Sequence, residues 1–177
     1  MKGISSKLGA VLLLFFVQAA FAQAPSQAAK EFSHTLSIEG AGKLTLSYRS
    51  LHWNDFAYNA AKKNAQQRER LNNGLWKKIG KFDTDFDVVI AGVAVPKGSY
   101  SLGINFDDSD HFKVVLGGTT KDIYVPLTTE ADDPLISYLT FDIRPSSTAD
   151  TFTLEGRSGK FRSYADLKIP SLSTPAR

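Results

Sequence analysis

The sequence predicts an all-β fold, an antiparallel β-sandwich of about eight or nine strands with one surface helix. Two observations support this prediction. Apolar and polar residues alternate with a period of two in many short stretches, and turn-forming Gly, Pro, Asn and Asp residues separate most of these stretches without an intervening helix. Short strands at such spacing favour an antiparallel sandwich over a parallel α/β sheet.

The predicted strands lie between Phe32 and the end of the chain. The alternation places them at Leu44–Tyr48, Asp83–Ile90, Ser99–Phe106, Phe112–Leu116, Asp122–Leu127, Ile136–Ile143, Phe152–Glu155 and Tyr164–Ile169. Between two of them, Pro96-Lys97-Gly98 has the residues of a type II turn, in which proline fixes one φ angle and glycine accepts a positive one. This turn is expected to set the register of the strands beside it.

One predicted helix interrupts the strands. Asn54-Asp55 is a suitable N-cap, Phe56–Leu71 is rich in Ala, Lys, Gln, Glu and Arg, and Asn72-Asn73-Gly74 ends the segment. Its apolar stripe is thin and consists of Phe56, Ala60, Ala61, Ala65 and Leu71. We therefore expect the helix to lie on the surface of the sandwich.

Residues 1–22 have the three parts of a secretory signal peptide. Lys2 and Lys7 supply positive charge, Leu8–Val17 forms an apolar core, and Ala20-Phe21-Ala22 offers small residues for cleavage before Gln23. The apolar core is about half the roughly 20 residues that a membrane-spanning helix needs. We expect cleavage, no membrane span after it, and export to the periplasm or the medium.

Cleavage is expected to leave a flexible leader at residues 23–31, a single β-sandwich domain at residues 32–170 and a disordered tail at residues 171–177. It reduces the 21 basic residues to 19 against 18 acidic ones, so the formal net charge falls from +3 to +1. No block of Lys or Arg remains that would bind a phosphate backbone, and nucleic acid is not expected as a partner. The chain has no cysteine, which excludes disulfides and thiolate chemistry.

The sequence contains no pattern that identifies a catalytic, metal or cofactor site. His34, His52 and His111 are widely separated, and neither a His-Glu-x-x-His nor a Gly-x-Ser-x-Gly segment is present. We predict no catalytic residue, no metal ligand and no cofactor. A hydrolase-type site that only folding assembles stays as an alternative.

Two acidic segments could nevertheless carry chemistry. On one strand, Asp83, Asp85 and Asp87 would project from the same face, where they could bind calcium or act as an acid and base pair. Asn105–His111 places several oxygen donors in one short loop, which suits a hard cation. The simpler interpretations are a solvated strand face for the first and an Asp-rich hairpin turn for the second, and we favour these.

The candidate binding residues are Arg49, His52 and Trp53, which lie within Tyr48–Asp55 between a predicted strand and the predicted helix. Aromatic faces beside Arg, Asn and Asp are suited to stacking on sugar rings or to anchoring a partner protein. The alternative is that Tyr48 and Trp53 fill the joint between helix and sheet while the Arg49 side chain extends to solvent.

The most distinctive segment of the chain is Val93–Leu102, with the sequence Val-Ala-Val-Pro-Lys-Gly-Ser-Tyr-Ser-Leu. Together with Trp76 upstream and Lys113-Val114-Val115-Leu116 downstream, it resembles a bacterial exported family known only as domain of unknown function number twenty-nine eleven. The resemblance covers roughly Leu44–Arg144 and implies an all-β exported domain with no assigned activity. Lys77–Phe82 departs from the residues that follow the tryptophan in that family, so the resemblance assigns no site residue.

These observations favour an exported, non-catalytic β-sandwich that binds a ligand or partner through the Trp53 region. The partner could be a small molecule, a glycan or a protein. One alternative is a purely structural or accessory domain of the cell envelope, in which all the large aromatic side chains are core. The burial of Trp53, Trp76 and His52 separates these hypotheses, because a binding surface needs these side chains exposed around a common groove.

Overall fold

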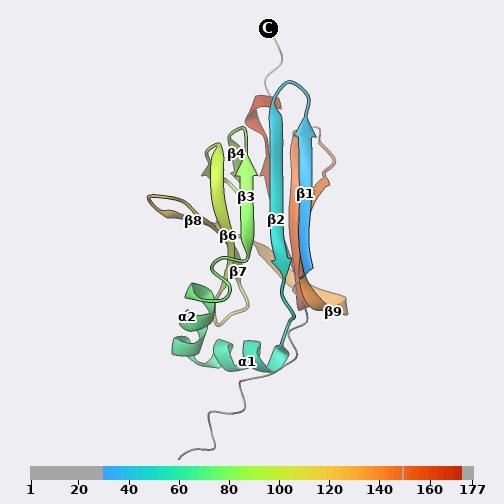
Figure 1. Cartoon of the computed structure of the whole chain (residues 1–177). Helices are drawn as coiled ribbons and strands as arrows, with labels where there is room; N and C mark the ends of the chain where they lie inside the picture. Colours follow the sequence, from blue (N-terminus) through green and yellow to red (C-terminus); the bar gives the residue numbers. More distant parts are fainter. Residues whose placement is uncertain (1–29, 149, 173–177) are drawn as a thin grey trace, which may run out of the picture.

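The computed structural model describes residues 30–148 and 150–172 and shows two antiparallel sheets packed face to face (Figure 1). The six-stranded sheet has the order β1 (Lys30–Ile38), β2 (Gly42–Ser50), β3 (Gly80–Thr84), β6 (Gly98–Phe106), β7 (Phe112–Gly117), β8 (Asp122–Pro126). The four-stranded sheet has the order β5 (Val93–Val95), β4 (Val88–Ile90), β10 (Thr151–Lys168), β9 (Thr128–Pro145). The predicted β-sandwich is confirmed, with more strands than expected.

The alternating residues of both sheets form one core between them. In β2, Leu44 and Leu46 are fully buried while Thr45 between them faces outward. Phe82 of β3 continues this inner face in the six-stranded sheet, and Leu154 and Leu167 of β10 supply the opposing face. Burial of such side chains contributes about 1.5–3 kcal/mol each to folding, so hydrophobic packing holds together a chain that has no disulfide.

The four-stranded sheet is built around two long, bent strands, β9 and β10. Phe152–Glu155 and Tyr164–Ile169, predicted as separate strands, belong to the single strand β10. The pairing of β10 with β9 shifts register on both sides of Gly159, whose φ of 56° is in the left-handed region. A bulge of this kind bends a strand without ending it, so the alternation is interrupted around Gly159 although the strand continues.

The single predicted helix is two helices, α1 (Asp55–Lys63) and α2 (Ala65–Asn73), which lie at one end of the sandwich (Figure 1). Asn64 separates them. It is the C-cap of α1 and also the N-cap of α2, where its side chain accepts a hydrogen bond from the Gln67 N–H. Side chains of α1 that face the sandwich include the buried Tyr58 and Ala61, whereas Phe56 is 83% exposed. A short 3₁₀-helix, Pro170–Leu172, follows β10.

The predicted strand Asp83–Ile90 is wrong as a single element, because the chain passes from one sheet to the other within it. β3 ends at Thr84 in the six-stranded sheet and β4 begins at Val88 in the four-stranded sheet. Thr84, Phe86 and Val88 all face the shared interior. The in-and-out alternation therefore continues through the crossing and does not reveal it.

The predicted type II turn at Pro96–Gly98 is also corrected. Pro96 and Lys97 connect β5 of one sheet to β6 of the other, so they do not form a hairpin. Gly98 has a φ of 156°, far from the value of about +80° that a type II corner requires. The Lys97 N–H donates to Asp87 Oδ1 and the Tyr100 hydroxyl donates to the Pro96 C=O, and these bonds hold the crossing.

Most of the predicted terminal segments lie outside the described residues. This applies to the signal peptide at residues 1–22, to the leader up to residue 29 and to the tail from residue 173. Lys30 and Glu31, assigned to the leader, are the first residues of β1, and Ser171 and Leu172, assigned to the tail, are in the 3₁₀-helix. Within residues 30–172, no helix has the length and apolar character needed to cross a membrane.

Candidate ligand-binding groove

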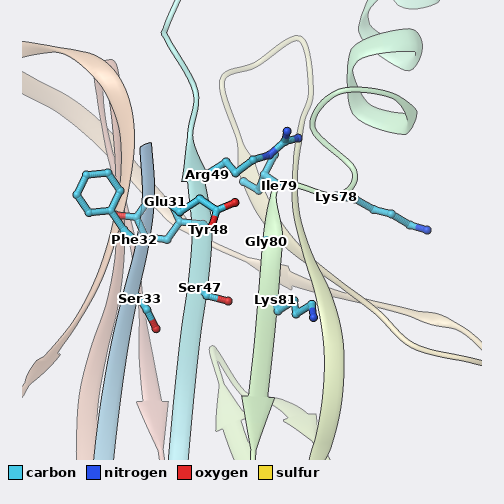
Figure 2. Close-up of a pocket in the computed structure, with 10 residues that line it drawn as sticks. All are labelled: Glu31, Phe32, Ser33, Ser47, Tyr48, Arg49, Lys78, Ile79, Gly80 and Lys81. Atoms are coloured by element: carbon cyan, nitrogen blue, oxygen red, sulfur yellow. The ribbon is translucent and has the colours of Figure 1, made fainter. Parts of the chain in front are cut away.

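An open groove of about 570 Å³ lies on the outer face of the six-stranded sheet, over β1, β2 and the start of β3 (Figure 2). A volume of this order is within the roughly 300–1,000 Å³ of small-molecule sites. The groove is lined by Glu31, Phe32, Ser33, Ser47, Tyr48, Arg49, Lys78, Ile79, Gly80 and Lys81. Arg49, a candidate from the sequence, is among them.

The register of the sheet makes the floor of the groove polar. Ser33 of β1 is directly opposite Ser47 of β2, and Ser47 is directly opposite Lys81 of β3. Directly opposite residues project from the same face of a sheet, and Figure 2 shows these three side chains at one level on neighbouring strands. The hydroxyls of Ser33 and Ser47 can each donate and accept a hydrogen bond, whereas the ammonium group of Lys81 can only donate.

Lys81 in this floor, together with Arg49 and Lys78 beside it, brings three cations to the groove. Arg49 is opposite Glu31 across β1 and β2, while Lys78 precedes β3 and Lys81 is within it. All three cationic side chains are exposed. The ion pairs found among the described residues use other cations, namely Lys62, Arg68, Lys77, Arg144, Arg157 and Arg162. The groove therefore has three cations and one carboxylate, Glu31, an excess that favours an anionic ligand.

The backbone beneath the cations is held firmly. The Arg49 N–H donates to the Ile79 C=O at 2.8 Å, and the Ile79 N–H donates to the Leu102 C=O at 2.8 Å. Gly80 lies against Ser47 and Tyr48, where any Cβ would collide with the backbone of β2. Ile79 is buried, so Lys78 and Lys81 extend from a segment fixed on both sides.

Trp53, by contrast, is part of an aromatic cluster at the end of the sandwich covered by α1. We use this term for Trp53, Tyr58, Trp76, Phe106, Phe112 and Phe161. The Trp53 ring is 4.8 Å from that of Tyr58, 5.7 Å from that of Trp76 and 6.0 Å from that of Phe161. Its Nε1–H donates to Asp55 Oδ1 at 2.7 Å. The half-buried indole thus has its faces and its polar atom already occupied.

His52 lies on a third surface. Its backbone forms a bridge with Tyr138 of β9, and the two rings meet edge to face at 5.2 Å. The flanking bonds, from the Trp53 N–H to the Ser137 C=O and from the Leu139 N–H to the Leu51 C=O, join the end of β2 to the other sheet. The structure therefore brings Arg49 into the groove and places His52 and Trp53 elsewhere.

The three aspartates of the sheet crossing each have a separate structural role. Asp83 accepts a hydrogen bond from the Ser99 hydroxyl, Asp85 accepts one from the Lys43 N–H at 2.9 Å, and Asp87 accepts one from the Lys97 N–H at 2.8 Å. They do not share one strand, because β3 ends at Thr84. Asp83 bonds across two paired strands, while Asp85 and Asp87 each accept a backbone N–H beside the sheet crossing.

The acidic loop between β6 and β7 is likewise held by its own hydrogen bonds. Asp107 Oδ1 accepts from the N–H groups of Ser109 and His111, and these bonds together with the His111 imidazole lower the pKa of Asp107, although partial burial opposes this. Lys62 and Tyr58 donate to Asp110 at 2.7 and 2.5 Å and lower its pKa against the same opposition. Burial, followed by the bond to Asp110, raises the pKa of Tyr58. The loop thus anchors α1 to the sheet.

The groove contains no arrangement of a nucleophile and a base. None of its lining residues is a histidine, and Ser33 and Ser47 face each other and Lys81 across the floor. The Tyr48 hydroxyl donates to the Phe141 C=O at 3.1 Å, and burial raises the pKa of Tyr48. In the described part of the chain, no three His, Asp or Glu side chains gather as a group that could hold a metal ion.

The sequence contained a partial signal for the groove residues that were missed. Lys81, Ser47 and Ser33 are the polar members of alternating segments, so their outward direction follows from the pattern. Their juxtaposition depends on which strands pair and in which register, and that was not accessible from the alternation alone. Lys78 precedes β3 and has no such pattern.

Comparison of the chain with protein-family models, with curated proteins and with solved structures finds no match. The resemblance to the exported family of unknown function stays a prediction.

Proposed function

We propose that the chain is an exported, non-catalytic binding protein that holds a segment of an anionic glycan in the groove. The observation that carries this proposal is the presence of Arg49, Lys78 and Lys81, exposed and outside the ion pairs of the described residues, around a floor of serine hydroxyls. Export is part of the proposal and is supported by the signal pattern of residues 1–22.

The chemistry of the lining favours an acidic sugar over a neutral one. Arg49 can bind a carboxylate with two hydrogen bonds, and the two lysines add charge without fixed geometry. Ser33 and Ser47 can exchange hydrogen bonds with sugar hydroxyls.

Titration calorimetry with an oligogalacturonate tests the proposal, with a neutral cello-oligosaccharide of equal length as the control ligand. We expect binding of the acidic chain only, with an affinity that falls as salt is added, because the interacting charges are exposed. Arg49→Ala should raise the dissociation constant about ten-fold or more, since loss of a charge-assisted hydrogen bond costs about 1.5–3 kcal/mol.

Lys113→Ala is the matched control. Lys113 is exposed on β7, opposite Asn105 on the same outer face, but does not line the groove. Its replacement should leave the dissociation constant within about two-fold of the parent, a difference of less than about 0.5 kcal/mol. Equal losses for Arg49→Ala and Lys113→Ala would indicate nonspecific attraction to a basic surface and would contradict the proposal.

The second candidate is a structural or accessory envelope domain. The aromatic cluster favours it over binding at Trp53, because the indole is used for packing and its Nε1–H is bonded to Asp55. This candidate predicts that neither the acidic nor the neutral oligosaccharide binds. Replacement of Arg49 and Lys81 would then leave the calorimetric titration unchanged.

A further inference from the structure

The outer edge of β1 is an uncovered strand edge. In an antiparallel pair, opposite residues alternate between those that exchange both backbone hydrogen bonds and those that exchange none. Arg49 donates its N–H to Ile79 and Lys43 accepts at its C=O from Asp85, so both residues direct their backbone groups toward the β3 side of β2. Their partners in β1, Glu31 and Ser37, therefore direct theirs away from β2.

Backbone direction alternates in the same way along the whole of β1. The N–H and C=O groups of Glu31, Ser33, Thr35 and Ser37 all point to the open edge, and within the described residues no backbone or side-chain group bonds them there. β1 has nine residues, a continuous register with β2, and no proline. Long regular edges of this kind are templates for the addition of another strand.

The other sheet edges are protected. β8 is five residues long and ends in Pro126, and β5 is three residues long and is followed by Pro96. β9, the edge nearest β1, is covered by specific bonds between Ser137 and Ile143, and its first half contains Pro134. Leu139 pairs with Leu51, the Phe141 C=O accepts from the Tyr48 hydroxyl, and the Ile143 N–H donates to the Asp142 carboxylate. The described residues of β1 have none of these devices along its nine positions.

We propose that the edge of β1 pairs with β1 of a second copy of this chain, antiparallel and centred on His34, to make a symmetric dimer with one continuous sheet. This proposal does not depend on the proposed function of the groove.

The proposed register is self-complementary. With His34 opposite its own symmetry mate, Glu31 is opposite Ser37 of the second copy and Ser33 is opposite Thr35, so every free N–H and C=O of these four residues gains a partner. On the inner face, Phe32 is opposite Leu36 of the second copy. Phe32 is 41% exposed and Leu36 is half-buried, so this pair would bury apolar surface that one copy leaves open.

The charges also permit this pairing. No two like charges are opposite each other, because Lys30 is opposite Ile38 and Glu31 is opposite Ser37 of the second copy. The two central imidazoles each keep their own acidic neighbour, since His34 Nδ1 lies 3.5 Å from Asp142 Oδ1. We favour a second copy as the partner because β1 is complementary to itself in this register, in its backbone groups, its apolar pair and its charges.

Two single-cysteine variants test the register, because the chain has no other cysteine. In the proposed dimer the Cα atoms of the two central residues are about 4.5 Å apart, within the disulfide range, while those of residue 35 are about 8 Å apart and outside it. We expect His34→Cys to form a covalent dimer on mild oxidation and Thr35→Cys to stay uncross-linked. Equal cross-linking of both variants would overturn the register.

Sedimentation equilibrium with charge variants tests the dimer without a cysteine. In Ser33→Lys/Thr35→Lys, lysines are opposite each other across the interface, and the dimer dissociation constant should rise about ten-fold or more. In Ser33→Glu/Thr35→Lys, each lysine is opposite a glutamate, and dimerisation should return. A parent that sediments as a monomer at all concentrations would overturn the proposal, as would a double-lysine variant that dimerises like the parent. Circular dichroism confirms that each variant is folded.

Discussion

Arg49 and Trp53 are four positions apart in the chain and lie in structurally opposite environments. Trp53 packs against Tyr58, Trp76 and Phe161, and its Nε1–H is bonded to Asp55. Arg49 extends from the outer face of the sheet into a groove, and no ion pair of the described residues includes it. The chain leaves β2 between them and crosses to β9. Residues that share one sequence motif therefore serve different purposes, one for stability and the other for surface chemistry.

This comparison predicts that substitutions around Trp53 reduce stability, whereas substitutions around Arg49 affect binding. The largest stability loss is expected at Gly159, on which Trp53 packs. Gly159 has a φ of 56°, and a Cβ there would collide with the indole ring. Gly159→Ala should lower the free energy of unfolding by about 3–5 kcal/mol, the combined cost of a left-handed non-glycine residue and of overpacking. Urea denaturation measures it.

Gly40→Ala is the control for that change. Gly40 has a φ of 74° in the turn between β1 and β2, and a Cβ there would meet no atom within 4 Å. Gly40→Ala should therefore lower the free energy of unfolding only by the cost of holding an alanine in the left-handed region, about 1–2 kcal/mol. Equal losses at Gly40 and Gly159 would show that the contact with Trp53 contributes nothing, and the comparison between cluster and groove would be weakened.

Removal of the indole itself should have the next largest effect. Trp53→Ala is expected to cost about 3 kcal/mol, at the low end for a large aromatic residue because Trp53 is only half-buried. His52→Ala, next to it in the chain but exposed, should change stability by less than about 0.5 kcal/mol. Thermal denaturation of the two variants separates them. A stable Trp53→Ala protein that no longer binds ligand would place the site at Trp53 and contradict our assignment.

A smaller effect is expected at Asp110, which connects the cluster to the acidic loop through Tyr58. Asp110→Asn removes the ion pair with Lys62 and should cost about 1–2 kcal/mol at pH 7. The pKa of Asp110 is lowered below 3.8 in the folded state, so its stabilising effect is present above about pH 4 and is lost as the pH falls through the folded pKa. The variant should therefore lose less stability than the parent between pH 7 and pH 3. A parallel pH dependence in both proteins would exclude this role.

The sequence predicted the sandwich because the inner faces of the strands alternate regularly, as in Leu44 and Leu46. It did not predict the crossing at Asp85–Asp87, where the alternation continues while the chain changes sheets. It also missed the break at Asn64, because a residue that caps two helices at once resembles an ordinary polar position within one helix. These errors concern connections, which alternation does not encode.

The site was harder to predict than the fold for a related reason. The groove combines residues from β1, β2 and the segment around Ile79, and only the register brings Ser33, Ser47 and Lys81 into one row. The aromatic cluster similarly joins Trp53 to Phe106 and Phe161, which are distant in sequence. Arg49 was a candidate because it lies among aromatic residues in the sequence, whereas in the structure it shares the groove with Lys78, which precedes β3, and Lys81 within β3.

Mapping of backbone amide shifts by NMR during titration with an oligogalacturonate tests the central claim most directly, because it reports on the groove and on the aromatic cluster in one experiment. We predict that the amides of Ser33, Ser47 and Lys81 shift in a saturable manner, and that those of Trp53 and Tyr58 stay in place. Shifts confined to the Trp53 region, or no saturable shift at any amide of β1, β2 and β3, would contradict the assignment of the groove as the binding site.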